Sequence, residues 1–240
     1  MYISLKKNKL KKKIKIVAII PARSGSKSII NKNIKKINGK PLLAWSINTC
    51  KLSKKIDYFF VLTNSEKYKA IAKKYGADVP FERPSKISKD DSPDYDFISY
   101  SLKCLNKINI FPKIILNIRP TTPFRDSKII DKAILKFLKN YKKFTSLRSV
   151  QEMSETSFKT VTVNKKGIMV PIIKKFSMED LEKPRQKFEK TYSPNGYVDI
   201  YKVEEIYKKR LVGKKVMAFE TNKTIEIDSI YDLKIARNFI

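Results

Sequence analysis

An apolar strand that leads into a cationic loop is the feature that most constrains this 240-residue chain. Residues 14–20 are almost continuously apolar and mostly β-branched, which predicts a central strand buried on both faces. Pro21 cannot donate to a sheet ladder, so we expect the strand to end there. The loop that follows is built of small residues and carries three cations, Arg23, Lys27 and Lys32. Small side chains let backbone N–H groups approach a polyanion, so the stretch predicts a phosphate-binding turn, with an ordinary solvated connection as the alternative.

Two common nucleotide-binding motifs are excluded at this loop. The P-loop reads Gly-x-x-x-x-Gly-Lys-Ser/Thr, and the stretch from Gly25 to Ser28 lacks both its first glycine and its Gly-Lys pair. The dinucleotide fingerprint needs three closely spaced glycines, and the six glycines of this chain are never that close. The loop therefore belongs to neither class.

The segment Ile20–Lys27, followed by Asn31-Lys32-Asn33 and Gly39-Lys40-Pro41, closely resembles the opening of the acylneuraminate cytidylyltransferases. That family includes the CMP-legionaminic and CMP-pseudaminic acid synthetases. Its members couple CTP to a nine-carbon 2-keto-3-deoxy sugar acid for surface glycan biosynthesis and release pyrophosphate. The resemblance implies that this loop wraps the triphosphate. The nucleotide-binding residues that it implies are Arg23, Ser26, Lys27, Lys32, Asn33 and, farther along, Arg83.

The composition narrows the possible chemistry. The chain has no histidine, which removes His-dependent triads, His zinc sites and imidazole acid–base catalysis. Cys50 and Cys104 are expected to pack in helices without forming a bridge, which points to a reducing cytoplasm. The net charge of +30 invites a nucleic-acid interpretation, but the lysines are spread over the whole chain. We therefore expect neither a nucleic-acid partner nor, from the short apolar runs, a membrane segment.

Strands alternate with helices through the first 150 residues. Buried strands are expected at 58–63 and 113–118, each followed by a helix. This alternation predicts right-handed βαβ units and a mostly parallel sheet, which is an α/β fold. Ligands bind beyond the carboxyl ends of such strands, so the loops 21–33, 63–65 and 119–126 should meet at one rim.

Past the middle of the chain the pattern changes. Residues 157–163 and 168–173 alternate like antiparallel strands. The resemblance implies a Rossmann-like, three-layer nucleotide-diphospho-sugar transferase fold in which 151–195 is a small antiparallel excursion for dimerisation and acceptor binding. We therefore expect a basic N-terminal tail, 1–13, and a single cytidylyltransferase domain, 14–240.

Two further stretches match the family on the acceptor side. Arg119-Pro-Thr-Thr-Pro-Phe-Arg resembles a family motif that begins with Gln near the sugar, and Arg119 replaces that Gln. Pro-Arg-Gln at 184–186 and Pro-Asn-Gly at 194–196 resemble two more family signatures. A sugar carboxylate needs a planar bidentate partner, which arginine supplies better than lysine. The substrate-binding residues that the resemblance implies are Arg119, Thr121, Lys159 (across a dimer), Arg185 and Asn195.

The last stretch is an acid-x-acid pair, Glu226 and Asp228. If residues 224–227 form a strand, as expected, both carboxylates point to the same side. Two acids so placed can hold Mg²⁺, which clamps phosphate oxygens. The family pattern is Asp-Ile-Asp with both aspartates as metal ligands, so Glu226 is a conservative departure that acts directly or through water.

These observations predict a cytidylyltransferase that binds CTP, a 2-keto sugar acid and Mg²⁺ and forms a homodimer. The residues expected to carry the catalysis are Arg23, Lys32 and Asp228. Two alternatives stay open. The acceptor can be the eight-carbon KDO, or the chain can be a basic RNA-binding protein.

Overall fold

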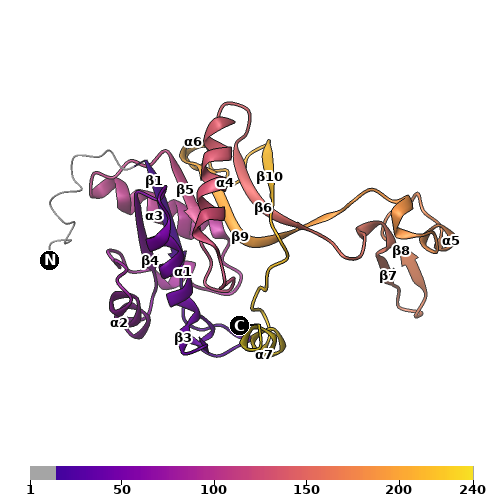
Figure 1. Cartoon of the computed structure of the whole chain (residues 1–240), viewed down its shortest axis with the longest axis horizontal. Coiled ribbons are helices and arrows are strands. Elements are labelled where there is room, and N and C mark those ends of the chain that lie inside the picture. The colour runs from indigo at the N-terminus through magenta and orange to yellow at the C-terminus, as the bar shows by residue number, and fades with distance from the viewer. Residues whose placement is uncertain (1–14, 240) are drawn as a thin grey trace.

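The computed structural model describes residues 15–239, so the expected basic tail at 1–13 lies outside the described residues. The chain forms a six-stranded sheet in the order β10-β6-β9-β5-β1-β4, with helices on both faces (Figure 1). The strands of this sheet are β1 (Ile16–Pro21), β4 (Tyr58–Leu62), β5 (Ile114–Asn117), β6 (Ser146–Glu152), β9 (Tyr192–Lys202) and β10 (Val216–Glu220). All of them run parallel except β9, which lies antiparallel between β5 and β6. The expected α/β fold with a mostly parallel sheet is confirmed.

Strand β1 lies between β4 and β5 and ends at Pro21, as predicted. Its residues Val17 to Ile20 are completely buried. Ala18 and Ile20 pack into the core on one face of the sheet, and Val17 and Ile19 pack into the core on the other. The nearly continuous apolar run of the sequence is therefore explained by a strand covered on both faces.

Helices cover both faces because each carries an apolar stripe. In α4 the residues Ile130, Ala133, Ile134 and Phe137 recur at three- and four-residue spacing and are all buried. The helices on that face are α1 (Leu42–Leu52), α2 (Glu66–Lys74) and α4 (Ser127–Lys139), and those on the other are α3 (Asp94–Lys107) and α6 (Val203–Tyr207). The helix α7 (Ile230–Arg237) packs in a third cluster beside the small hairpin of β2 (Lys36–Ile37) and β3 (Lys40–Pro41). Every helix within residues 15–239 is too short or too polar to cross a bilayer.

The loops after β1, β4 and β5 meet at the carboxyl ends of the strands, as expected. The Ser24 backbone N–H donates to Asn64 Oδ1 over 2.8 Å, which joins the first two loops. The Ile227 N–H donates to the Thr121 carbonyl over 2.7 Å, and Lys32 Nζ donates to the Ile227 carbonyl over 3.1 Å. Ile227 therefore connects the loop after β1 to the loop after β5. We call the end of the sheet where these loops meet the rim.

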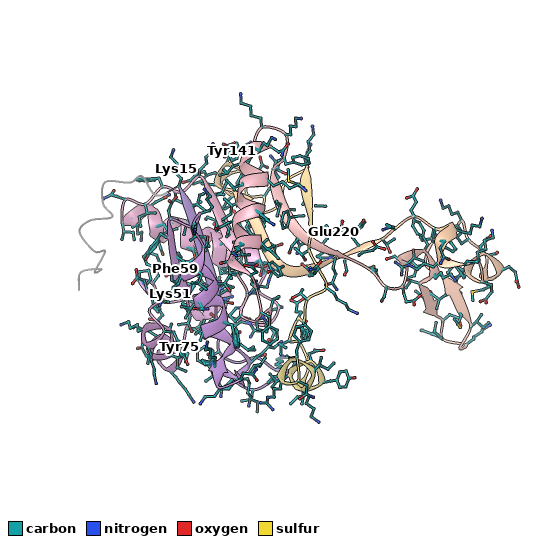
Figure 2. The ribbon with its side chains drawn as sticks, in the orientation of Figure 1. Lys15, Lys51, Phe59, Tyr75, Tyr141 and Glu220 are labelled. Carbon is teal, nitrogen blue, oxygen red and sulfur yellow. The ribbon has the colours of Figure 1, made fainter. Side chains whose placement is uncertain are left out.

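Residues 153–191 form an arm that projects away from the body at the ends of β6 and β9 (Figure 1). The side chains of the arm are separate from those of the body, and Glu220 at the end of β10 lies on the side from which the arm leaves (Figure 2). The arm has its own small core, in which the rings of Phe158, Phe176 and Phe188 lie with centroids 5.7–6.1 Å apart. Its elements are η4 (Ser157–Lys159), β7 (Val161–Val163), β8 (Met169–Pro171), α5 (Met178–Leu181) and η5 (Arg185–Lys187). The predicted antiparallel pair exists as β7 and β8, shorter than expected.

The strand expected at residues 224–227 is not formed, and this segment has no regular secondary structure. Its backbone N–H groups donate to isolated acceptors at the rim and not to a neighbouring strand. The Thr224 N–H donates to Gln151 Oε1 over 3.0 Å, and the Ile227 N–H donates to the Thr121 carbonyl. The segment therefore crosses the strand ends instead of joining a sheet. Glu226 and Asp228 are placed by this crossing, and strand alternation does not apply to them.

Candidate active site

The loop after β1 is held in shape by its own polar groups. Gly25 has a φ of +80°, a conformation that residues with a Cβ rarely adopt. The Ser24 hydroxyl and N–H both meet Asn64 Oδ1. The buried Asn33 donates its side-chain N–H to the Arg23 carbonyl over 2.9 Å. Asn33, predicted to bind the nucleotide, therefore orients the backbone of the loop, as does Asn64.

Two cations of the loop share one carboxylate. Arg23 pairs with Asp90 and also donates to the Gly25 carbonyl over 3.3 Å. Lys27 Nζ lies 3.7 Å from the other oxygen of Asp90. Ser26, between them in sequence, is half-buried. Asp90 follows η3 (Ser85–Ile87) and was not predicted, because nothing in its polar surroundings distinguishes it from other loop acids.

The third cation joins the two ends of the chain. Lys32 Nζ lies 3.1 Å from Asp228 Oδ1 although 196 residues separate them in sequence. The Lys32 side chain is only 11% exposed, whereas that of Asp228 is 71% exposed. The cationic loop and the acid pair therefore meet at one place on the rim. The exposure of the Asp228 side chain leaves it accessible to a further ligand.

The other member of the acid pair lies deeper. Glu226 Oε1 and Thr122 Oγ1 are each 3.1 Å from the position that a Cβ on Gly196 would occupy, so this turn accepts only glycine without rearrangement. Burial raises the pKa of the Glu226 carboxyl, and the negative charge of Asp228 raises it further. Two neighbouring carboxylates that repel one another fit a divalent cation, which would relieve the repulsion. Residues 15–239 contain no group of three or more acidic or cysteine side chains that could hold a metal, so the remaining ligands would come from nucleotide and water.

Arg83 is buried and lies near the loop after β1. Its guanidinium donates to the Ile87 carbonyl over 2.6 and 3.0 Å and stacks on the ring of Phe97 at 4.9 Å. Burial lowers the pKa of Arg83 to about 10, and the positive charge of Arg23 acts in the same direction. Arg83 is therefore close to the loop cations but is buried and holds the segment that carries Asp90.

A network of four charged residues comes from the loop after β5, the interiors of β6 and β9, and the start of α3. Arg119 donates from one outer nitrogen to Asp199 and from the other to Asp94, both over 2.6 Å. Arg148 Nε donates to the second oxygen of Asp199 over 3.2 Å. Burial alone would lower the pKa of Arg119, but Asp199 and Asp94 more than offset it and hold that pKa above its ordinary value. Asp199 lies on β9 three residues from Gly196, the residue beside Glu226, so the strand connects the network to the acid pair.

Sequence reasoning identified only Arg119 of this network. A signal for Asp199 was present, because it interrupts the otherwise apolar and aromatic strand from Tyr197 to Tyr201. A carboxylate in a buried strand must have a partner, since its burial unpaired is costly. Such reasoning predicts a cation nearby but does not say which of the arginines supplies it.

Other predicted residues support the rim from within. The carbonyl of Thr121 accepts from Ile227, and the amide of the buried Asn195 donates to Thr221 Oγ1 over 2.7 Å. Arg125, for which a helix-start role and a ligand role were both open, is buried and donates to the carbonyls of Thr122, Gly196 and Tyr197. It holds the turn at Gly196 against the loop after β5.

The two remaining predicted residues belong to the arm. Arg185 pairs with Glu152 over 2.8 Å at the root of the arm, where the two residues line a pocket of about 330 Å³. Lys159 Nζ lies over the ring of Phe188 at 5.9 Å. Lys159 and the loop after β1 therefore do not come together within one chain.

Comparison with known proteins identifies relatives of the chain. Residues 17–236 match the profile of the family described as cytidylyltransferase. An N-acylneuraminate cytidylyltransferase of Escherichia coli O18:K1:H7 is 31% identical over 229 residues, which cover 92% of this chain and 51% of that protein. A pseudaminic acid cytidylyltransferase of Campylobacter jejuni serotype O:23/36 is 34% identical over 131 residues, which cover 55% of this chain and 56% of that protein. The chain thus spans about half the length of these curated relatives.

The fold is also that of a solved structure. CMP:2-keto-3-deoxy-manno-octonic acid synthetase complexed with CTP matches this chain with a TM-score of 0.69. The match covers 93% of this chain and 97% of that chain at 16% sequence identity. At that identity the likeness establishes the common fold.

Proposed function

Because the chain belongs to the cytidylyltransferase family, we propose that it activates a nine-carbon 2-keto-3-deoxy sugar acid with CTP and releases pyrophosphate. The relatives that act on N-acylneuraminic and pseudaminic acids support this substrate class. The observation that carries the proposal is the contact between Lys32 and Asp228. It joins a cationic loop suited to a triphosphate with an acid pair suited to Mg²⁺.

The nucleotide lies, in this proposal, along the loop after β1. Arg23, Lys27 and Lys32 bind the β- and γ-phosphates and offset the charge that develops on the departing pyrophosphate. Asn33 and Arg83 keep the loop and its neighbouring segment in place. Asp228 and Glu226 are the residues that would hold Mg²⁺, and the ion would supply positive charge to the α-phosphate oxygens.

The acceptor lies on the opposite side of the acid pair. Its anomeric hydroxyl attacks the α-phosphorus, the new O–P bond forms, and the bond to the β-phosphate oxygen breaks in line with it. The hydroxyl proton leaves to a carboxylate or to water, since the chain has no histidine. The residues proposed for this side are Arg119, with Thr121 and Asn195 as support, and Arg185 and Lys159 from the arm.

The arm also supports a homodimer. Lys159 belongs to the arm, where its Nζ lies over the Phe188 ring, and the arm projects away from the body that carries the loop cations. An arm that reaches a second copy would bring Lys159 to the acceptor side of that copy. We therefore propose that two chains complete each other's acceptor sites.

The proposal is tested by pyrophosphate release with CTP, Mg²⁺ and a panel of sialic, legionaminic and pseudaminic acids, with KDO as the eight-carbon alternative. Asp228→Ala should lower kcat by about 100-fold or more, because the metal loses its exposed ligand. Arg23→Ala should chiefly raise the KM for CTP. Asp91→Ala, which removes an exposed carboxylate close to the loop, serves as the control. Salt-sensitive RNA binding without pyrophosphate release would instead favour the nucleic-acid alternative.

A further inference from the structure

Arg148 is the one member of the charged network that keeps donors free. Among residues 15–239, neither outer nitrogen of Arg148 has a hydrogen-bond or ion-pair partner, and only Nε is used, by Asp199. The Arg148 side chain is 38% exposed, while Asp199 is 1% exposed. Arg119 differs, because each of its outer nitrogens already donates to a carboxylate.

This arrangement fixes the direction of the Arg148 guanidinium. Asp199 is held from its other oxygen by Arg119, so it cannot turn away from Arg148 without losing a buried ion pair. A guanidinium anchored through Nε presents its two outer nitrogens as a planar fork, which matches the two oxygens of a carboxylate. Anchoring it beforehand lowers the entropy lost on binding.

The chemistry of the acceptor says where such a fork is needed. In the cyclic form of a 2-keto sugar acid, the reacting hydroxyl and the carboxylate sit on the same carbon. The cation that binds the carboxylate must therefore lie close to the acid pair that serves the reacting phosphate. The network fulfils this condition through β9, since Asp199 lies three residues from Gly196, and an added Cβ on Gly196 would lie 3.1 Å from Glu226 Oε1.

Arg185 of the same chain is less free to bind a carboxylate with both outer nitrogens. One of them already donates to Glu152 over 2.8 Å, in the pocket that these two residues line with Gln151 and Lys223. Arg185 is therefore suited to another polar group of the acceptor or to a second copy.

We propose that Arg148, oriented by the buried Asp199, binds the carboxylate of the acceptor and sets the preference for a sugar acid. This inference rests on the proposed function. Arg148 contacts the substrate, and Asp199 is a positioning residue that acts through Arg148 and Arg119.

The test compares Arg148→Gln and Arg148→Lys with the wild-type protein in the pyrophosphate assay. Arg148→Gln should raise the KM for the sugar acid about tenfold or more and leave the KM for CTP within about twofold. Arg148→Lys should recover part of the loss, because it keeps the charge but not the fork. The control is Arg210→Gln, which also removes an arginine from a carboxylate, Glu205, at the opposite edge of the sheet.

A second measurement distinguishes a loss of carboxylate recognition from a loss of protein stability. The wild-type protein should prefer the sugar acid to its methyl ester, and Arg148→Gln should lose most of that preference. Asp199→Asn should also weaken acceptor binding, and thermal unfolding of each variant monitors the fold. If Arg148→Gln does not fold, Arg148→Lys and the ester comparison still decide.

Two results would overturn the inference. One is an unchanged KM for the acid in a folded Arg148 variant, and the other is an equal rise of both KM values with the ester preference retained. Absence of pyrophosphate release by the wild-type protein with every acid is a different failure. It would contradict the proposed function itself, and the inference would fall with it.

Discussion

Asp90 pairs with two cations of the loop after β1, Arg23 and Lys27, which we propose bind the triphosphate. A carboxylate in that position competes with phosphate for the same donors. It also stays close enough to repel a bound polyanion. We regard Asp90 as a counter-ion that a nucleotide or pyrophosphate must displace.

Removal of this competitor gives a first prediction. Asp90→Asn should bind CTP and pyrophosphate about threefold to tenfold more tightly than the wild-type protein, because the charge that opposes the phosphates is gone. Isothermal titration calorimetry with pyrophosphate measures this without turnover. The neighbouring Asp91→Asn makes the same change of charge and should have a smaller effect. Equal or weaker binding by Asp90→Asn would show that Asp90 instead orients Arg23 for the ligand.

Gly196 gives a prediction about stability. Its φ is +63°, and an added Cβ would lie 3.1 Å from both Glu226 Oε1 and Thr122 Oγ1. Gly196→Ala should therefore lower the free energy of unfolding by about 1–3 kcal/mol. Gly167→Ala is the matched control, since its φ is +78° but nothing lies within 4 Å of its added Cβ. Urea denaturation of both variants distinguishes the effect of the close Cβ contacts from that of backbone strain. An equal loss of unfolding free energy in the two variants would rule out an effect of the close contacts.

At the scale of residues, the sequence predicted which kinds of residue form the candidate site. It predicted less well which residues pair with one another there. The small, cationic loop was recognisable because phosphate binding demands that composition locally. Asp90 and Asp94 were not recognisable, because each acquires its role only when a distant arginine reaches it, and for Asp199 the sequence indicated a need for a cation without identifying which one. The hydrogen bond from Asn33 to the Arg23 carbonyl could not be distinguished in advance from a ligand contact.

At the scale of elements, long periodic segments were predicted and short ones were not. Strand β1 and helix α4 have enough apolar residues in register to specify one structure. The stretch 224–227 alternates like a strand yet crosses the rim, because its hydrogen-bond partners are Gln151 and Thr121 instead of a neighbouring strand. Alternation over four residues does not distinguish these two outcomes.

The arm supplies a prediction about an element. Phe158, Phe176 and Phe188 form its aromatic core, and each ring pair contributes about 0.5–1.5 kcal/mol beyond the burial of its area. Phe188→Ala should therefore loosen the arm while the sheet stays folded. Hydrogen exchange should become faster at amides of 153–191 and stay unchanged in β1. Phe111→Ala, which truncates an exposed phenylalanine of the body, should leave the arm unaffected. Unchanged exchange in the arm of Phe188→Ala would contradict this role.

At the scale of the whole molecule, the apolar side chains on the arm need a partner. The hairpin of β7 and β8 and the residues beside it expose several large apolar side chains, namely Val163, Ile168, Met169, Val170 and Ile172. Exposed apolar side chains concentrated on one small element are typical of an interaction site. A projecting arm with such a surface is consistent with the proposed homodimer.

The corresponding prediction concerns assembly. Sedimentation velocity should show a dimer of the wild-type protein and a monomer when Ile168→Asp and Val170→Asp are combined, because two charges would be buried in the interface. Leu135→Asp places a charge on an exposed apolar residue of α4 and should leave the dimer intact. A wild-type protein that sediments as a monomer at micromolar concentration would contradict the proposed pairing.

Strand β9 is a single unbroken element from Tyr192 at the root of the arm to Lys202 at the far edge of the sheet. It carries Gly196 beside Glu226 and Asp199 beside Arg148. β9 pairs with β6 from the root of the arm onward and with β5 over residues 199–202, so it connects the arm directly to the surroundings of Asp199. In the proposed homodimer, docking of the arm onto a second chain would therefore also constrain the geometry of the docking chain's own rim.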